Sequence, residues 1–273
     1  MIFETHIPSL PLSKYIASIV YYDGYNPNHT FEKLLPDGSV YLLIDFKDIP
    51  KKCCHSDDFS DFETFTSSYI SGQHKKYIYI EATQDSSMMV VQFKFGGTAP
   101  FFDCKISELN ETVRQSEYYF GDALDNLRTE MLQESIVHAK ISKMERFLLD
   151  RMNETLESNP ILTALQLLET NPFEVTTKKL ALAAGISQKH LISLFDKYVG
   201  LTPKTLARIY RFQQVLKQIE VKKDIDWLQL LADCGYYDQS HFVKDFHDFS
   251  GINPTQYLDE KGEYLNYIPV KQG

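Results

Sequence analysis

Cysteine is scarce in this chain, because its 273 residues contain only Cys53, Cys54, Cys104 and Cys234. A disulfide framework needs more cysteines at regular spacings, so we expect reduced thiols. No CxxC pair occurs, and His55 beside Cys53 and Cys54 is the only compact group of soft metal ligands. Structural zinc needs four ligands in paired spacings. We therefore expect no bound metal and no cofactor.

Long apolar runs are absent as well. No stretch approaches about eighteen uninterrupted apolar residues, the length that a membrane-spanning helix needs. The opening residues MIFETHIPSLPLSKY lack the basic start and the apolar run of a secretory signal. We therefore expect a cytoplasmic protein with no membrane partner.

Sequence motifs that bind phosphate or carry out hydrolysis are also missing. The chain has neither a GxxxxGK[ST] loop nor a GxGxxG loop, and Gly96-Gly97 alone is typical of a turn. A serine nucleophile elbow is absent, and His241 and His247 cannot share a helix face as the histidines of HExxH do. The acidic segment 56–68 lacks the pattern of a calcium loop, so we expect it to be a solvated loop. We assign no catalytic residues and expect that the chain is not an enzyme.

Positive charge is in deficit, because 28 Lys and Arg residues stand against 37 Asp and Glu residues, which gives a net charge of −9. This balance argues against wholesale attraction to nucleic acid. The charge is unevenly distributed, since residues 171–258 contain 11 Lys and Arg against 9 Asp and Glu. Composition therefore permits nucleic-acid binding by this segment without demonstrating it.

The length and a change of hydrophobic period indicate two domains. Short apolar runs bounded by turn residues predict β-strands at 40–46, 77–80 and 88–95, in a sandwich or barrel. Between residues 116 and 151, apolar residues recur every three or four positions, which predicts helices. Asn159-Pro160 then interrupts the pattern, and we place the domain boundary near 155–160.

We therefore predict an α+β chain in three parts. Residues 1–115 form a β-barrel or sandwich-like regulatory domain that holds any effector. Residues 116–158 form a helical linker or dimerisation region. Residues 159–262 form an all-α domain, in which two similar units are joined by a long helix.

Two segments of this last domain share one skeleton: GISQKHLISLFDKYVGLTPKTL (185–206) and GYYDQSHFVKDFHDFSGINPTQYL (235–258). In each, a glycine permits a sharp turn, and Ser187 or Asp238 can cap the helix that follows. The motif Gly-x-[Thr/Asn]-Pro then follows the end of that helix, which we call the exit of the unit. The predicted anchors of these helices are Leu191, Leu194, Phe195 and Tyr198 in the first unit and Phe242 and Phe246 in the second. A helix, a tight turn and an anchored helix are helix-turn-helix geometry, and two in tandem rarely arise by chance.

These features resemble the AraC/XylS-type transcription regulators across residues 161–258. The likeness rests on both exits, on the connecting helix around RIYRFQQVL and on the block GYYDQSHF. One position departs from the family, which usually has Ala four residues before the turn glycine. Ala181 matches that pattern, whereas the second unit has Leu231. The segments LLPDG (34–38) and FKFGGTAPFF (93–102) are similar to an N-terminal domain often joined to such regulators.

The resemblance implies a sequence-specific DNA-binding transcription regulator. Its partners would be double-stranded DNA, RNA polymerase and a small-molecule effector at the N-terminal domain. The second helix of each unit would enter a major groove. The DNA-binding positions that the resemblance assigns are Gln188, Lys189, Ile192 and Ser193 in the first unit, and Gln239, Ser240, Val243 and Lys244 in the second. The sequence names neither effector nor operator, and it leaves open whether target genes are activated or repressed.

Two other classes of protein stay open on the residues alone. A small barrel enzyme with an incidental C-terminal module would need convergent acid and base groups in its cavity. An interaction protein would use the double unit to bind another protein. Self-association is a further open question. The helices between 116 and 151 could hold a homodimer together, or their apolar stripe could pack on the β-domain as ordinary core.

Overall fold

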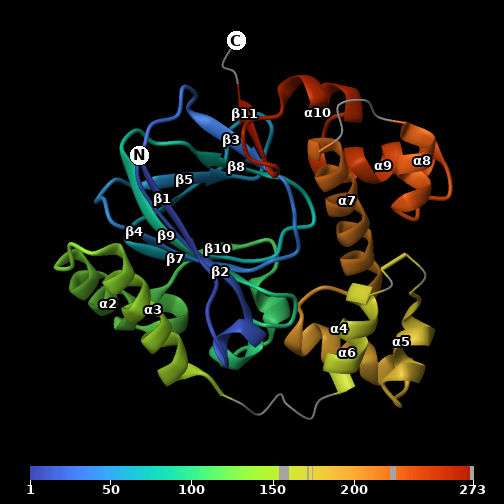
Figure 1. The fold of residues 1–273 in the computed structure, drawn as a ribbon, viewed down its shortest axis with the longest axis horizontal. Coiled ribbons are helices and arrows are strands. Elements are labelled where there is room, and N and C mark those ends of the chain that lie inside the picture. Colours follow the sequence, from blue (N-terminus) through green and yellow to red (C-terminus); the bar gives the residue numbers. More distant parts are fainter. Residues whose placement is uncertain (154–159, 171, 174, 222–225, 271–273) are drawn as a thin grey trace.

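The computed structural model describes residues 1–153, 160–170, 172–173, 175–221 and 226–270. Within them a β-rich half precedes a helical half, which confirms the predicted α+β class (Figure 1). The predicted break at Asn159 lies outside the described residues. No helix in the described part of the chain is both long enough and apolar enough to cross a membrane.

The strands of the described residues form two antiparallel sheets. They are β1 (Ile2–His6), β2 (Ile16–Tyr25), β3 (Phe31–Leu34), β4 (Tyr41–Asp45), β5 (Lys51–Cys54), β6 (Phe62–Phe65), β7 (Ser68–Ser71), β8 (Ile78–Glu81), β9 (Ser86–Phe93), β10 (Val113–Gln115) and β11 (Tyr267–Val270). Sheet A has the strand order β1-β2-β9-β4-β7-β10, and sheet B has the order β11-β3-β8-β5-β6. The three predicted apolar runs are confirmed as β4, β8 and β9.

The expectation of a solvated loop over residues 56–68 is wrong in part. Residues 62–65 form β6, which pairs with β5 at the edge of sheet B. Three of the four β6 residues are exposed. Pairing with β5 satisfies the backbone groups whatever the polarity of the side chains, so a polar sequence can still form an edge strand.

Successive residues of β4 and β9 point to opposite faces of sheet A, as a pleated strand requires. Leu42 and Val91 belong to a cluster on the outer face, while Leu43 and Val90 belong to a cluster between the sheets. The helices α1 (Glu117–Phe120), α2 (Ala123–Leu132) and α3 (Val137–Arg151) follow β10 in the chain. In Figure 1, α2 and α3 lie against sheet A.

These helices confirm the helical region predicted between residues 116 and 151. Their buried residues join the outer cluster of sheet A, and these are Phe120, Leu124, Leu127, Met131, Ile141, Met144 and Leu148. The apolar stripe is therefore core of the β-domain. A homodimer through this region stays a prediction.

The helical half contains α4 (Pro160–Thr170), α5 (Thr177–Ala183), α6 (Gln188–Tyr198), α7 (Pro203–Val221), α8 (Trp227–Asp233), α9 (Gln239–Ser250) and α10 (Pro254–Glu260). The connecting helix α7 has 19 residues, which corresponds to roughly 28 Å at about 1.5 Å per residue. In Figure 1, α5 and α6 lie near one end of α7, and α8 and α9 lie near the other.

After α10 the chain returns to the β-rich half. Strand β11 pairs with β3, and Tyr267 lies opposite Leu34. Figure 1 shows this red C-terminal segment beside β3 and β8. The sequence reading did not anticipate β11, which contains Pro269. A proline is tolerated here because β11 lies at the edge of sheet B.

Candidate nucleic-acid interface

The first helix-turn-helix unit consists of α5, a turn at Gly185 and α6. Gly185 has φ +68°, a left-handed conformation that glycine adopts without strain. The hydroxyl of Ser187 accepts a hydrogen bond from the backbone N–H of His190 at 3.2 Å, which confirms the predicted cap. Leu191 and Phe195 are fully buried, so these two predicted anchors fix the inner face of α6.

The second unit consists of α8, a turn at Gly235 and α9. Asp238 accepts a hydrogen bond from the backbone N–H of His241 at 2.7 Å and caps α9 as predicted. Phe242 and Phe246 are 2% and 0% exposed, which confirms both anchors. The departure at Leu231 is also accommodated, because this side chain lies in the same core as the first unit's alanine.

A buried ion pair fixes the orientation of α9 on the connecting helix. The guanidinium of Arg208 in α7 donates to a carboxylate oxygen of Asp245 at 2.7 and 3.0 Å. Arg208 also donates to Asp248 at 2.8 Å. Asp245 is only 2% exposed, so the charge on its carboxylate is stabilised by this contact rather than by water. The exposed face of α9 is consequently held at a defined angle to α7.

All eight predicted DNA-binding residues lie on α6 or α9 and are exposed to solvent. Ile192 and Val243 are 48% and 38% exposed, so neither is part of the core. Exposure on one helix face is what a groove contact requires. Contact of these residues with DNA stays a prediction.

The exposed side of α9 carries a shallow hollow in the surface. Its lining contains all four predicted residues of the second unit, together with His247 and Asp248. The sequence reading missed these last two residues. Helical spacing could have found them, because each lies four positions after a predicted one.

An aromatic side chain beside this face was missed as well. Tyr237, in the turn before α9, is 95% exposed. The doublet Tyr236-Tyr237 carried no sequence signal that distinguished the buried ring from the exposed one. Tyr236 is 5% exposed and packs against Phe242.

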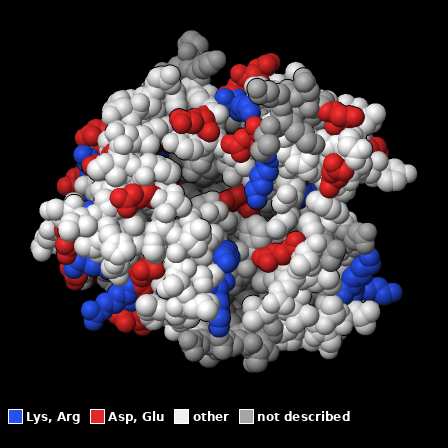
Figure 2. Space-filling model, in the orientation of Figure 1, with Lys and Arg blue, Asp and Glu red and all other residues white. Residues whose placement is uncertain are grey.

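Charge on the molecular surface is mixed in sign. Figure 2 shows basic and acidic side chains interspersed on one face, with no continuous basic area across it. On the face shown in Figure 2, the distribution of charge does not favour attraction of DNA by bulk charge alone.

In the described residues, no three His, Cys, Asp or Glu side chains gather in a way that could hold an ion. Cys53 and Cys54 are buried. Burial raises the pKa of the Cys53 thiol to about 12. The thiolate form, which ligates metals, is therefore disfavoured at this position.

Two family models match the chain, one in its N-terminal part and one in its C-terminal part. Residues 180–260 match the family described as a helix-turn-helix domain, and residues 4–115 match a domain of unknown function (DUF6597). The chain thus carries a helix-turn-helix domain after a β-rich N-terminal region. No curated protein sequence shows a significant match to the chain.

Several solved structures are similar to this chain. ToxT from Vibrio cholerae is 10% identical over 94% of this chain and 98% of its own, with a TM-score of 0.49. The AraC-like transcriptional activator CuxR is 14% identical over 84% of this chain and 91% of its own, with a TM-score of 0.29. A DNA-binding transcriptional dual regulator from Escherichia coli K-12 is 22% identical over 38% of this chain and 100% of its own, with a TM-score of 0.34. Likeness at this level carries no information about ligands or targets.

Proposed function

We propose that this chain is a sequence-specific DNA-binding transcription regulator, and that its affinity for DNA responds to a small molecule bound in the β-domain. The pair of helix-turn-helix units near the two ends of α7 supports DNA binding (Figure 1). One turn of duplex is about 34 Å long, close to the length of α7. The exposed faces of α6 and α9 would therefore enter successive major grooves.

The two helices that would contact DNA bases, α6 and α9, are called here the reading helices. They offer different chemistry. On α6, Lys189 suits a phosphate or guanine contact and Ile192 suits a thymine methyl group. On α9, Gln239 suits bidentate pairing with adenine, and Lys244 can reach guanine acceptors. Tyr237 stands beside α9, where its hydroxyl can donate to a phosphate.

An effector site is supported by a cavity between the two sheets. Its volume is about 390 Å³, and its walls include residues of both sheets, such as Tyr22 and Leu43 from sheet A and Leu34 and Ile80 from sheet B. Small-molecule sites typically have volumes of about 300–1,000 Å³.

The first helix-turn-helix unit and the neighbouring helices α4 and α7 contact segments that extend from sheet A. Asn110, shortly before β10, donates its side-chain amide to the carbonyl oxygen of Gly200 at 2.7 Å. Gly96, shortly after β9, lies so close to the helices that a Cβ there would come within 2.5 Å of Leu165. Phe95 packs against Tyr210 in the middle part of α7, with ring centroids 5.7 Å apart.

The second unit contacts sheet B instead. The backbone N–H of Tyr77, next to β8, donates to the carbonyl oxygen of Phe249 in α9 at 3.1 Å. The ammonium of Lys33, in β3, donates to the carbonyl oxygen of Ser250 at 3.2 Å. The C-terminal end of α9 is therefore held by two neighbouring strands of sheet B.

The two helix-turn-helix units contact different sheets, and this arrangement supports a physical route by which a bound ligand would change DNA affinity. The cavity lies between the sheets, and each sheet carries a different reading helix. A ligand that changes the separation or tilt of the sheets would move α6 relative to α9. Both helices must match the groove spacing at once, so a small displacement would change DNA affinity.

The cavity also contains acidic and basic side chains, as the enzyme interpretation requires. Its carboxylates Glu32 and Asp37 accept hydrogen bonds from tyrosine hydroxyls, and its buried Lys51 is paired with Asp45. On this ground we favour a cavity that holds a ligand over one that transforms it. A regulator of this kind would act in the cytoplasm with the DNA, and RNA polymerase as a partner stays a prediction.

Selection of bound duplexes from a random pool tests the DNA-binding proposal. The full-length chain is used, because β11 and the contacts described above join its two halves. We expect enrichment of two short half-sites about one helical turn apart. A pool that stays unenriched at low salt, with a chain that is folded by circular dichroism, would contradict the proposal.

A further inference from the structure

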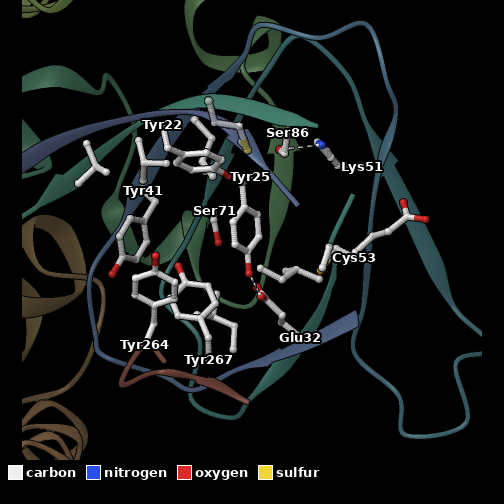
Figure 3. Close-up of a pocket in the computed structure, with 18 of the residues that line it drawn as sticks. Tyr22, Tyr25, Glu32, Tyr41, Lys51, Cys53, Ser71, Ser86, Tyr264 and Tyr267 are labelled. Atoms are coloured by element: carbon white, nitrogen blue, oxygen red, sulfur yellow. Dashed lines mark hydrogen bonds between the residues drawn. The ribbon is translucent and has the colours of Figure 1, made fainter. Parts of the chain in front are cut away.

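The lining of the cavity indicates which chemical class of ligand it holds. Figure 3 shows tyrosine side chains gathered around the cavity, with Tyr264 and Tyr267 entering from the C-terminal segment. The rings of Tyr264 and Tyr267 meet edge to face at 76°, with their centroids 6.3 Å apart. Tyr22 and Tyr25 meet similarly, at 74° and 6.0 Å. Aromatic faces on several sides of a cavity attract a cation through the ring quadrupole.

Two carboxylates lie within this aromatic wall. Glu32 is 7% exposed and accepts hydrogen bonds from the hydroxyl of Tyr25 at 2.9 Å and from the imidazole of His29 at 2.8 Å. Asp37 accepts from the hydroxyl of Tyr41, from the backbone N–H of Ser39 and from the side chain of Gln92. In the described part of the chain, no Lys or Arg nitrogen lies within 4.0 Å of either carboxylate. Neither carboxylate therefore has a lysine or arginine partner, and the only ion-pair partner of Glu32 among the described residues is the imidazole of His29.

Tyr267 lies within electrostatic range of both carboxylates. Burial raises the pKa of Tyr267, and Tyr22, Glu32 and Asp37 add smaller contributions in the same direction. Burial also raises the pKa of Asp37. The hydroxyls of Tyr264 and Tyr267 have no hydrogen-bond partner among the residues that the structure describes, so they can accept from a ligand ammonium group.

The positive side chains of the lining are already occupied. The ammonium of Lys51 lies 3.3 Å from a carboxylate oxygen of buried Asp45 and also donates to Thr83 and Ser86. Lys52 is exposed and lies over the ring of Phe62. An anionic ligand would therefore find no uncompensated buried cation, and it would face two carboxylates.

A large part of the remaining lining is apolar. It comes from the cluster between the sheets and includes Leu34, Leu43, Phe65, Ile78, Ile80 and Val90. A ligand that fills this part of the cavity needs a hydrocarbon or aromatic body.

We infer that the cavity binds an amphipathic organic cation, with its protonated amine beside Glu32 and Asp37 within the tyrosine wall and its apolar body between the sheets. The inference deepens the proposed function by naming the class of effector. The cation adds a positive charge beside two carboxylates that have no lysine or arginine partner. Desolvation of the amine is offset by those carboxylates, the tyrosine hydroxyls and the ring faces.

Calorimetric titration of the full-length chain with three matched probes tests the inference. The probes are phenylbutylamine, phenylbutanol and phenylbutyrate, which share one apolar body and are cationic, neutral and anionic near neutral pH. We expect the amine to bind at least about ten-fold more tightly than either of the others. Equal binding of amine and alcohol, tighter binding of the anion, or no binding of the amine at millimolar concentration would each overturn the inference.

Substitution of each cavity carboxylate tests where the amine of the ligand binds. Glu32→Gln and Asp37→Asn should each weaken binding of phenylbutylamine by about ten-fold or more and leave binding of phenylbutanol nearly unchanged. Glu117→Gln, at an exposed position on α1, is the matched control and should bind the amine as the parent chain does. Thermal melting identifies any variant that fails to fold. Amine affinity that is unchanged in both cavity variants would overturn the assignment.

The titration contains no DNA, so the two proposals can fail separately. If the amine binds with the expected charge preference but leaves DNA affinity unchanged, the ligand class stands and the effector response fails. If the chain selects a DNA sequence but does not bind the amine, the DNA-binding proposal stands and the ligand class fails.

Discussion

Gln213 in α7 donates a hydrogen bond from its side-chain amide to the carbonyl oxygen of Pro36, across 2.8 Å. The same nitrogen donates to the amide oxygen of Asn266 at 3.0 Å. Asn266 lines the cavity, and so does Asp37, the residue after Pro36. Gln213 is 8% exposed, so one buried side chain of the connecting helix contacts two segments of the cavity wall.

Gln213→Leu should therefore weaken the link between ligand and DNA. Removal of the donor leaves the carbonyl of Pro36 without its partner, and we expect a loss of about 1–3 kcal/mol in the free energy of unfolding. We also expect DNA binding to persist while the change in DNA affinity on adding ligand becomes smaller. Denaturant unfolding and DNA titration with and without phenylbutylamine measure both effects.

The control for this change is Gln133→Leu at the exposed end of α2. It should alter neither the stability nor the ligand response by a measurable amount. A full ligand response in the Gln213→Leu chain would show that coupling does not pass through this hydrogen bond.

The helix-turn-helix units could be predicted from the sequence because their determinants are local. Gly185 and Gly235 set the turns, Ser187 and Asp238 cap the next helices, and apolar residues at three- and four-residue spacing mark the buried faces. Each signal lies within about twenty residues of the element that it defines. The assignment of bases to individual side chains stays a prediction.

The β-domain was only partly predictable because its pairing is non-local. Strand β11 pairs with β3 from the opposite end of the chain, and no short window of sequence contains that information. The cavity was missed for the same reason, since its tyrosines come from β2, β4, β7 and the C-terminal segment. The sequence predicted turns within the segments LLPDG and FKFGGTAPFF, and a resemblance to known regulators singled out the two segments. In the structure, Gly38 and Gly96 from these two segments lie against the helical half.

Asp245→Ala should destabilise the chain more than Asp248→Ala, although both carboxylates accept from Arg208. The side chain of Asp245 is 3% exposed and that of Asp248 is 44% exposed. Loss of the buried partner leaves a partly desolvated guanidinium, and we expect a cost of about 2–3 kcal/mol, against less than about 1 kcal/mol for the exposed partner. Denaturant unfolding measures both, and equal losses would show that burial of Asp245 contributes nothing to stability.

His74 should make the folded state sensitive to mild acid. Burial lowers its pKa from 6.5 to about 3, with a smaller contribution from the charge of His55. The carboxylate of Glu111 lies 4.0 Å away, but it is 42% exposed and does not offset the burial. Between these two pKa values the unfolded chain binds a proton that the folded chain does not, so stability falls as the pH falls below about 6.5.

The expected contribution of His74 is a loss of roughly 2 kcal/mol of stability between neutral pH and pH 5. His74→Gln should remove that part of the pH dependence, and His190→Gln, at an exposed position on α6, should retain it. Denaturant unfolding at several pH values compares the three chains. Parallel stability profiles for His74→Gln and the parent would show that this histidine does not titrate as its burial implies.

The two reading helices should divide the recognition of DNA unequally. Gln239 on α9 can pair bidentately with adenine, which is worth about 1–3 kcal/mol of discrimination against other bases, whereas a phosphate contact adds affinity that depends on salt. Gln239→Ala should therefore relax base preference at one operator position, and Lys189→Ala should weaken binding evenly across sequences and lower its salt dependence.

Gln166→Ala, at an exposed position on α4 away from both reading faces, is the control. The test is to measure the affinity of each chain for the selected site and its single-base variants at two salt concentrations. If every relative affinity is unchanged in the Gln239→Ala chain, this side chain remains solvated in the complex and α9 reads DNA through other residues.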